Sequence, residues 1–313
     1  MIRYVIKRLL LMIPIVLGVS FLIFSIMAIV PGNPATIILG HDATREAIDE
    51  LNRQLGLDRP FLERYFRYMY NVFVHQDFGI SYYFRSPVFP HIISRIPVSL
   101  TVTLTAFAFA LAIGTPIGIL SAVKQYSMYD TIPTLVALLF AAVPTFWLGM
   151  MLLLIFSLHL RWFPSAGIGS WEHYILPMLA LGFPYGAQQL RFTRSSMLDT
   201  IRQDYVRTAR AKGAPERTVI LKHALKNALL PVVTVIGMNF GRVLGGAVVT
   251  ETLFSIPGLG TLIVNGIKQK DTPMVCGGVI TLAIITAFLM LAVDLVYAAL
   301  DPRIRARYTN TGG

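Results

Sequence analysis

The chain has 313 residues, of which 55% are hydrophobic and only 14% are charged, and its formal net charge is +11. A soluble domain carries about 25% charged residues, so this composition indicates a protein that crosses a membrane several times. Basic patches in such proteins more often mark the loops on the cytoplasmic side of the membrane than a nucleic-acid-binding surface. The single cysteine, Cys276, excludes an internal disulfide and a cysteine-based metal cluster. Neither a Gly-rich phosphate loop nor a His-Glu-x-x-His pattern occurs, so no enzyme is predicted.

Six segments contain the roughly 20 predominantly apolar residues that a transmembrane helix needs. They cover residues 9–30, 98–122, 132–158, 174–194, 229–252 and 276–300. The first has too long an apolar run and too poor a cleavage site for a signal peptide, so we expect an uncleaved helix. Pro144 is expected to kink the third, and the short fourth contains Pro177 and Pro184. The predicted fold class is an all-α membrane protein with six transmembrane helices.

Basic residues between the spans predict the orientation, because they gather on the cytoplasmic side of a membrane. With the N-terminus inside, the cytoplasmic side holds Arg3, Lys7, Arg8, Lys124, the stretch 191–226, Arg303, Arg305 and Arg307. The short outer loops then hold only Arg161, Lys268 and Lys270. We therefore expect both termini in the cytoplasm, with residues 1–30 forming the N-terminus and first helix and 301–313 forming a tail.

The segment 31–97, which follows the first span, is rich in aromatic and apolar residues. Two series at helical spacing occur in it, namely Ile48, Leu51 and Leu55, and then Phe61, Tyr65, Tyr68 and Val72. We expect two short amphipathic helices on the outer membrane face, followed by an irregular stretch over 76–90. Two interpretations remain open for this segment. It is either a cap that stabilises the transmembrane bundle or a surface that contacts a delivered ligand or an extracellular partner.

A basic, polar stretch between the fourth and fifth spans is the most distinctive feature of the sequence. We name it the elbow and define it as residues 204–231. It overlaps the expected cytoplasmic coupling loop, 195–228, of the permease core 98–300. Helix-forming residues flank Gly213, and Pro215 follows two positions later. Because Gly accepts positive φ and Pro suits the first turn of a helix, two short helices joined by a tight turn are predicted. So many Lys and Arg side chains cannot lie in lipid, so the elbow must face water and a partner.

Ionisable residues inside the spans are further candidates, because a charge at the bilayer centre costs at least about 2.5 kcal/mol. Arg242 lies near the middle of the fifth span, Glu251 near its outer end and Asp294 in the inner half of the sixth. Arg242 either pairs with Asp294 or a carboxylate of another subunit, or lines a translocation path and meets a substrate carboxylate. A side chain that reaches the membrane interface is the third possibility.

Glycines at four-residue spacing mark two of the spans. Gly237, Gly241 and Gly245 lie in the fifth, and Gly114 and Gly118 lie in the second. Small residues at this spacing let helix backbones approach closely. Packing alone explains them, and a helix that slides against its neighbour during gating is the alternative.

The outer run from Glu251 to Gly260 combines turn-forming residues with apolar side chains such as Phe254. We expect it to fold back into the bundle at the external mouth as a plug or gate, with a plain turn as the alternative. The candidate translocation-path or gate residues are therefore Arg242, Gly241, Gly245, Glu251, Phe254 and Asp294. His159 and His223 have no partner at metal-ligand spacing, so no metal site is expected.

The elbow resembles the cytoplasmic coupling loop of bacterial ABC importer permeases. In that family the loop begins with a Glu-Ala-Ala triplet and has a glycine six residues after the Glu. Here Arg207-Thr208-Ala209 takes the place of the triplet, Gly213 is in register, and Leu230-Pro231 falls five residues later than the general pattern. These departures resemble the peptide and nickel subfamily, in which an Asp-Tyr-Val-Arg-Thr-Ala-Arg-Ala-Lys-Gly run is typical.

Further motifs of the dipeptide/oligopeptide permease family lie along nearly the whole chain. They are Leu55-Gly56-Leu57-Asp58-Arg59-Pro60, Asp77-Phe78-Gly79-Ile80-Ser81, Glu251 to Gly260, and Asp301-Pro302-Arg303-Ile304-Arg305. The resemblance implies a type I ABC importer permease fold in the bacterial inner membrane. The ATPase-coupling residues that it implies are Tyr205, Val206, Arg207, Thr208, Ala209, Arg210, Ala211, Lys212 and Gly213, with Pro215, Glu216 and Arg217 supporting the turn.

The resemblance also implies partners: a second, similar permease, two cytoplasmic ATPases and an extracytoplasmic substrate-binding protein. ATP and Mg would then be bound by the ATPases, with no cofactor in this chain. The expected function is import of short peptides, and nickel chelates, glutathione or oligosaccharides would share every motif. The alternative from another class is an ion-coupled secondary transporter. Such a protein should show embedded acidic residues and internal repeats, but only Asp294 and Glu251 qualify and no repeat is seen.

Overall fold

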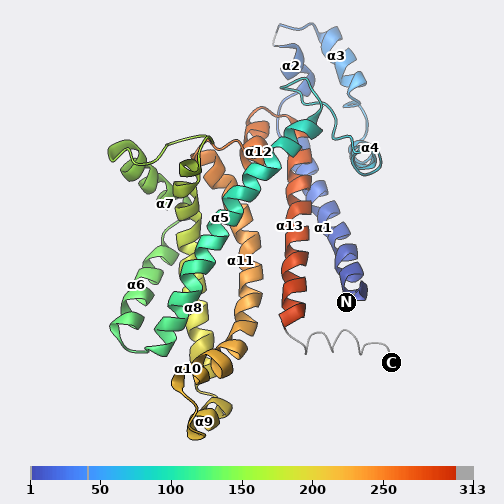
Figure 1. Ribbon diagram of the computed structural model, residues 1–313. Coiled ribbons are helices and arrows are strands. Elements are labelled where there is room, and N and C mark those ends of the chain that lie inside the picture. Colours follow the sequence, from blue (N-terminus) through green and yellow to red (C-terminus); the bar gives the residue numbers. More distant parts are fainter. Residues whose placement is uncertain (1, 41, 301–313) are drawn as a thin grey trace. The chain divides into compact units, whose positions relative to one another are not determined.

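The computed structural model describes residues 2–40 and 42–300, so the expected tail over 301–313 lies outside the described residues (Figure 1). The described residues form helices together with an isolated antiparallel bridge between Ile80 and Pro87. They divide into two compact units. We call Ile6–Ser99 with Pro257–Ala287 the N-terminal unit. The central unit consists of the described residues 2–5, Leu100–Ile256 and 288–300.

The N-terminal unit combines short helices with longer ones. Its elements are α1 (Ile2–Ile29), α2 (Pro34–Leu39), α3 (Arg45–Gln54), α4 (Phe61–Val74), the start of α5 (Val88–Val123), α12 (Leu259–Lys268) and the start of α13 (Thr272–Leu300). Thr44 begins α3 because its hydroxyl accepts a hydrogen bond from the Ala47 amide at 3.3 Å. Helix α3 contains Ile48 and Leu51 of the first apolar series, with Leu55 directly after its end, and α4 contains the whole second series.

Helix α4 packs one aromatic face against α1. The hydroxyl groups of Tyr65 and Ser20 lie 2.9 Å apart, and both side chains are buried. The Phe24 ring contacts the rings of Tyr65 and Tyr68 at centroid separations of 5.6 and 5.8 Å. Aromatic pairs at these separations add stability beyond the area that they bury. The segment 61–74 is therefore fastened to the first apolar helix by its aromatic residues.

The central unit carries the basic elbow. Its elements are the rest of α5, α6 (Met128–Ala142), α7 (Thr145–Leu152), a π-helical segment (Leu153–His159), a 3₁₀ turn (Trp171–Tyr174), α8 (Ile175–Ile201), α9 (Asp204–Ala211), α10 (Glu216–Thr218), a second π-helical segment (Val219–Ala224), α11 (Leu225–Leu253) and the end of α13. Figure 1 shows α9 and α10 projecting beyond one end of α8 and α11. The elbow thus lies at the tip of two long helices.

Helices α5 and α8 approach each other closely at glycine positions. A Cβ atom at Gly114 would lie 2.5 Å from the Gly186 carbonyl oxygen, and one at Gly118 would lie 2.7 Å from that of Leu190. No side chain fits between backbones at these separations. The spacing of Gly114 and Gly118 therefore serves close helix packing, as one of the two open interpretations proposed.

The predicted third span, 132–158, is not one continuous helix. Helix α6 and the helix beginning with α7 meet at an angle of 102°. Val143 adopts an extended conformation before Pro144, with φ −84° and ψ 127°. A proline disfavours helical geometry in the residue before it, so the expected kink is instead a break.

Four described helices are long and apolar enough to cross a membrane, and the bent pair would make a fifth. The four are Arg8–Ile29, Val88–Val123, Glu216–Leu253 and Thr272–Val293. Helix α8, which contains the predicted fourth span, is not among them because Gln188, Gln189, Arg191 and Arg194 interrupt its apolar sequence. It nevertheless continues through Pro184, and Pro177 lies in its first turn, where a missing N–H is tolerated. A sixth span accordingly remains a prediction.

Candidate coupling and translocation sites

The elbow folds as the short helix α9, a tight turn and the start of a continuous helix that runs from Glu216 to Leu253. The second of the two expected short helices is therefore the beginning of a long one. Gly213 follows α9 with φ +79°, a conformation that glycine adopts without strain. Arg210 closes the turn, because its Nε donates to Glu216 Oε2 at 3.1 Å and its Nη2 donates to Oε1 at 2.7 Å. These hydrogen bonds raise the pKa of Arg210 above its ordinary value, so the guanidinium stays charged. Glu216 and Arg210 therefore hold α9 and α10 in a fixed mutual arrangement.

One face of the elbow is anchored on the central unit. Val206 and Val219 are fully buried, and they cluster with Ala122 of α5 and Met197 of α8. Within the elbow, the Asn227 amide donates to the Tyr205 hydroxyl at 3.0 Å and ties α9 to the start of α11. A displacement of the elbow must therefore also displace the ends of α5 and α8, against which it packs.

The opposite face of the elbow is exposed and basic. Its exposed members among the predicted coupling residues are Tyr205, Arg207, Thr208, Arg210, Ala211, Lys212, Gly213, Pro215, Glu216 and Arg217, whereas Val206 is buried and Ala209 is half-buried. The Arg207 side chain is 76% exposed, and its 3.9 Å approach to Asp204 leaves it free to contact a partner. The surface offers cationic side chains around a short helix, which suits a groove on another protein.

Arg242 is exposed on α11 and forms no ion pair with any residue that the structure describes. The backbone carbonyl oxygen of Arg242 accepts a hydrogen bond from the Tyr185 hydroxyl at 2.9 Å. This bond holds the backbone of α11 and does not position the Arg242 guanidinium. The side chain of Asp294, the expected partner, lies outside the described residues. The pairing of Arg242 with Asp294 therefore remains a prediction.

The glycines of α11 differ in their surroundings. Gly237 and Gly241 lie against Val293 and Met290 of α13, where an added Cβ would clash. Gly245 has no neighbouring atom within 4 Å of such a Cβ. Close packing accounts for the first two positions, whereas Gly245 faces open space.

The start of the run from Glu251 is folded into the central unit. Glu251 is 1% exposed and Phe254 is 2% exposed. The Phe254 carbonyl oxygen accepts a hydrogen bond from the Gly167 amide at 3.1 Å, and the Phe254 ring lies against Gly149 of α7. The residues around Phe254 thus pack against other elements, as expected for a segment that folds back rather than a plain exposed turn.

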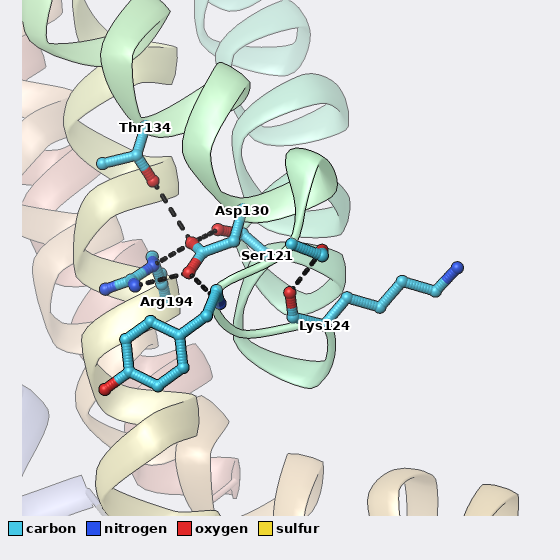
Figure 2. Close-up of polar contacts among 7 residues, drawn as sticks. Ser121, Lys124, Asp130, Thr134 and Arg194 are labelled. Atoms are coloured by element: carbon cyan, nitrogen blue, oxygen red, sulfur yellow. Dashed lines mark hydrogen bonds and ion pairs between the residues drawn. The ribbon is translucent and has the colours of Figure 1, made fainter.

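Sequence reasoning missed a buried polar cluster on α5, α6 and α8. Asp130, 5% exposed, lies in the first turn of α6, and Arg194 of α8 donates to it through Nε at 2.5 Å and Nη2 at 2.8 Å. Figure 2 shows these groups converging with Ser121, whose hydroxyl donates to Asp130 Oδ1 at 2.5 Å. Asp130 and Arg194 are far apart in the sequence, but both lie at predicted cytoplasmic ends of spans. That shared position was the signal that the sequence offered.

Two family models together match most of the chain. The model described as binding-protein-dependent transport system inner membrane component matches residues 114–306, which include the elbow and α11. The model for the N-terminal part of such membrane components matches residues 1–105.

The curated relatives include the glutathione transport system permease protein GsiC of Escherichia coli strain K12. It is 42% identical over 305 residues, which cover 97% of this chain and 99% of that protein. The protein of the same name from Shigella dysenteriae serotype 1 shows the same identity and coverage.

Solved structures share the fold at low sequence identity. An inward-facing MetNI methionine ABC transporter chain has a TM-score of 0.58 and 18% identity, covering 67% of this chain and 96% of that one. An amino acid ABC transporter solved with histidines has a TM-score of 0.52 and 15% identity, covering 68% and 94%. The chain therefore belongs to the family of binding-protein-dependent transport system inner membrane components, as the non-catalytic, multi-pass inner-membrane permease subunit of an ABC importer.

Proposed function

We propose that this permease forms the translocation path for short peptides, including di- and oligopeptides. The observation that carries this proposal is the 42% identity with a glutathione permease over 97% of the chain. Glutathione is itself a tripeptide, so that relative lies inside the proposed substrate class. The peptide-type sequence of the elbow supports the same class.

The proposed arrangement in the membrane has six spans and both termini in the cytoplasm. The bent pair of α6 and α7 would form the third span and α8 the fourth, which brings the elbow to the cytoplasmic side. Residues 31–97 would then be extracytoplasmic, within reach of a binding protein. Residues 98–300 would form the permease core, and 301–313 its tail.

The proposed complex has a second, similar permease, two cytoplasmic ATPases and an extracytoplasmic binding protein that delivers the peptide. ATP and Mg would be bound by the ATPases. The exposed, basic face of the elbow would dock in a groove of one ATPase. Because Val206 and Val219 are fully buried, closure of the ATPases would move the helices that bear the elbow. Such movement switches the cavity from inward-facing to outward-facing only if the contacts differ between the two states.

Arg242 is proposed to meet the carboxylate of the peptide. An exposed guanidinium near the middle of an apolar helix cannot face lipid without a large penalty, so it must face a watery cavity or the second permease. Gly241, Gly245, Glu251, Phe254 and Asp294 are proposed to line or gate the same path.

Uptake by the importer, purified through a tag on this chain and reconstituted in vesicles with its binding protein, tests this function. We expect ATP-dependent uptake of labelled glutathione or of unmodified di- and tripeptides, and little uptake of an oligosaccharide or a nickel chelate. Uptake of the oligosaccharide or the nickel chelate alone would contradict the proposal. Uptake driven by an ion gradient without ATP would support the secondary-transporter alternative instead.

The role of Arg242 is tested by Arg242→Ala with two forms of one substrate. We expect uptake of a peptide with a free carboxylate to fall more than uptake of its C-terminal amide. Equal losses for both forms would indicate that Arg242 only fastens helices together.

A further inference from the structure

The cluster around Asp130 uses all of the acceptor capacity of its carboxylate within the chain. Besides the two bonds from Arg194 and the one from Ser121, Asp130 Oδ2 accepts from the Tyr126 amide at 3.0 Å. Thr134 donates to Oδ1 at 3.4 Å, as Figure 2 shows. A carboxylate so fully engaged is not available to a substrate. Its role must therefore concern the helices that it joins.

Asp130 determines how α6 begins. The turn before α6 contains Tyr126 with φ +64°, a conformation that side-chain-bearing residues rarely adopt. The hydrogen bond from the Tyr126 amide to the Asp130 carboxylate stabilises this turn. Helix α6 then ends at Ala142, before the 102° break. With a turn at one end and a break at the other, α6 depends on its contacts with α8 for its orientation.

Further contacts between α6 and α8 come from apolar side chains. Ala137 of α6 clusters with Ala187 and Leu190 of α8, and the Phe140 and Phe183 rings stack at 4.7 Å. Apolar side chains gain little from each other in lipid, because lipid is equally apolar. These apolar contacts include no charged bond that would fix one relative position of the two helices. A bidentate pair between Arg194 and Asp130 instead fixes one relative position.

This pair lies directly beside the anchor of the elbow. Arg194 precedes Met197 by about one helical turn, and Ser121 adjoins Ala122 in the sequence. Met197 and Ala122 are the residues against which Val206 and Val219 of the elbow pack. The same ends of α5 and α8 therefore hold both the elbow and Asp130.

We propose that Asp130 and Arg194 are positioning residues that make α6 move together with α8 when the ATPases displace the elbow. The inference rests on the proposed function of the elbow as the ATPase-docking site. Without the pair, α8 would follow the elbow while α6 slipped along its apolar surface. ATP would then be hydrolysed without the membrane rearrangement that carries the substrate.

The test compares wild-type importer with Asp130→Asn and Arg194→Lys, measuring ATP hydrolysis and peptide uptake in the same vesicles. Lysine keeps the charge but cannot donate two bonds from a planar group, so it is the milder change. We expect uptake per ATP hydrolysed to fall roughly tenfold, within the range of measured couplings between sites. The double variant should lose no more than either single variant, because the two residues act as one pair.

Arg191→Lys is the matched control, since Arg191 is exposed on the same helix one turn earlier. We expect it to keep the wild-type ratio of uptake to hydrolysis. The proposal is overturned if Asp130→Asn and Arg194→Lys keep that ratio too, or if Arg191→Lys lowers it equally. A merely structural role would lower the amount of assembled complex without changing the ratio.

Hydrogen–deuterium exchange on the same complex separates failure of this inference from failure of the proposed function. We expect ATP to change exchange over both 124–134 and the elbow in wild type, and over the elbow alone in Arg194→Lys. A wild-type complex that shows this pattern but takes up no peptide would contradict the proposed substrate and support the pair. A wild-type complex in which ATP changes exchange at the elbow but not over 124–134 would contradict the pair.

Discussion

Two arginine–carboxylate pairs in the central unit have the same bidentate chemistry but differ in burial. The side chains of Asp130 and Arg194 are 5% and 25% exposed, whereas those of Glu216 and Arg210 are 58% and 38% exposed. Breaking a buried pair leaves an uncompensated charge, at a cost of about 3–5 kcal/mol. An exposed pair contributes roughly 0–1 kcal/mol. We call Asp130–Arg194 the inner pair and Glu216–Arg210 the outer pair. The inner pair therefore fixes the relative position of helices, and the outer pair shapes a surface for a partner.

The largest expected effect comes from breaking the inner pair. Asp130→Ala should lower the free energy of unfolding by about 3–5 kcal/mol, because Arg194 then lacks its partner. Glu216→Ala is the control, with an expected loss below about 1 kcal/mol. Denaturation of the detergent-solubilised chain measures both. Equal losses would contradict the assigned difference in burial.

The next largest loss of stability is expected from a substitution at Gly118, a glycine close to the inner pair. Gly118→Val should cost about 1–3 kcal/mol, because it places extra atoms into packed space. Its Cβ would lie 2.7 Å from the Leu190 carbonyl oxygen and 2.8 Å from Thr193 Cβ. Gly245→Val, at an open position on α11, serves as the control in the same denaturation experiment. A tolerated Gly118→Val would mean that α5 and α8 are not closely packed.

The glycine beside the outer pair should behave differently. Gly213 has open space around a hypothetical Cβ but a φ of +79°. Gly213→Ala should therefore cost about 1–2 kcal/mol through conformation alone. Gly213→Asn should cost less, since Asn tolerates this region. If the two substitutions prove equally costly, crowding rather than backbone conformation limits the turn.

The smallest expected effect is that of salt on the stability that each pair contributes, and it should differ between the two pairs. The screening length falls from about 10 Å at 0.1 M to about 3 Å at 1 M salt. The loss of stability in Glu216→Ala should vanish at the higher concentration, whereas that of Asp130→Ala should persist. Denaturation at both salt concentrations measures the difference. A loss in Asp130→Ala that disappears with salt would show that the inner pair is solvated.

The elbow could be predicted from the sequence because its signals are local. Gly213 and Pro215 specify the turn, and the surrounding basic residues exclude lipid. The short helix α9 and the turn were therefore predicted correctly, whereas the helix after the turn is longer than expected and runs from Glu216 to Leu253. The residues that contact an ATPase remain a prediction, because they depend on a surface outside the chain.

The inner pair and the broken third span could not be predicted in the same way. Asp130 and Arg194 are brought together only by the packing of α6 on α8, which no local pattern encodes. Pro144 signalled a kink, but the extended geometry of Val143 depends on the surrounding helices. The sequence analysis left the partner of Arg242 open between Asp294, another subunit and the substrate, and the exposure of Arg242 fits a contact outside the chain.

Photo-crosslinking from the elbow tests the central claim most directly. A photoreactive residue at Arg207, which is 76% exposed, should form an adduct with an ATPase subunit in the intact importer. The same residue at Tyr83, which is 55% exposed in the predicted extracytoplasmic segment, should form none. An importer that yields no ATPase adduct from position 207, or equal adducts from both positions, would contradict the assignment of the elbow as the ATPase-docking site.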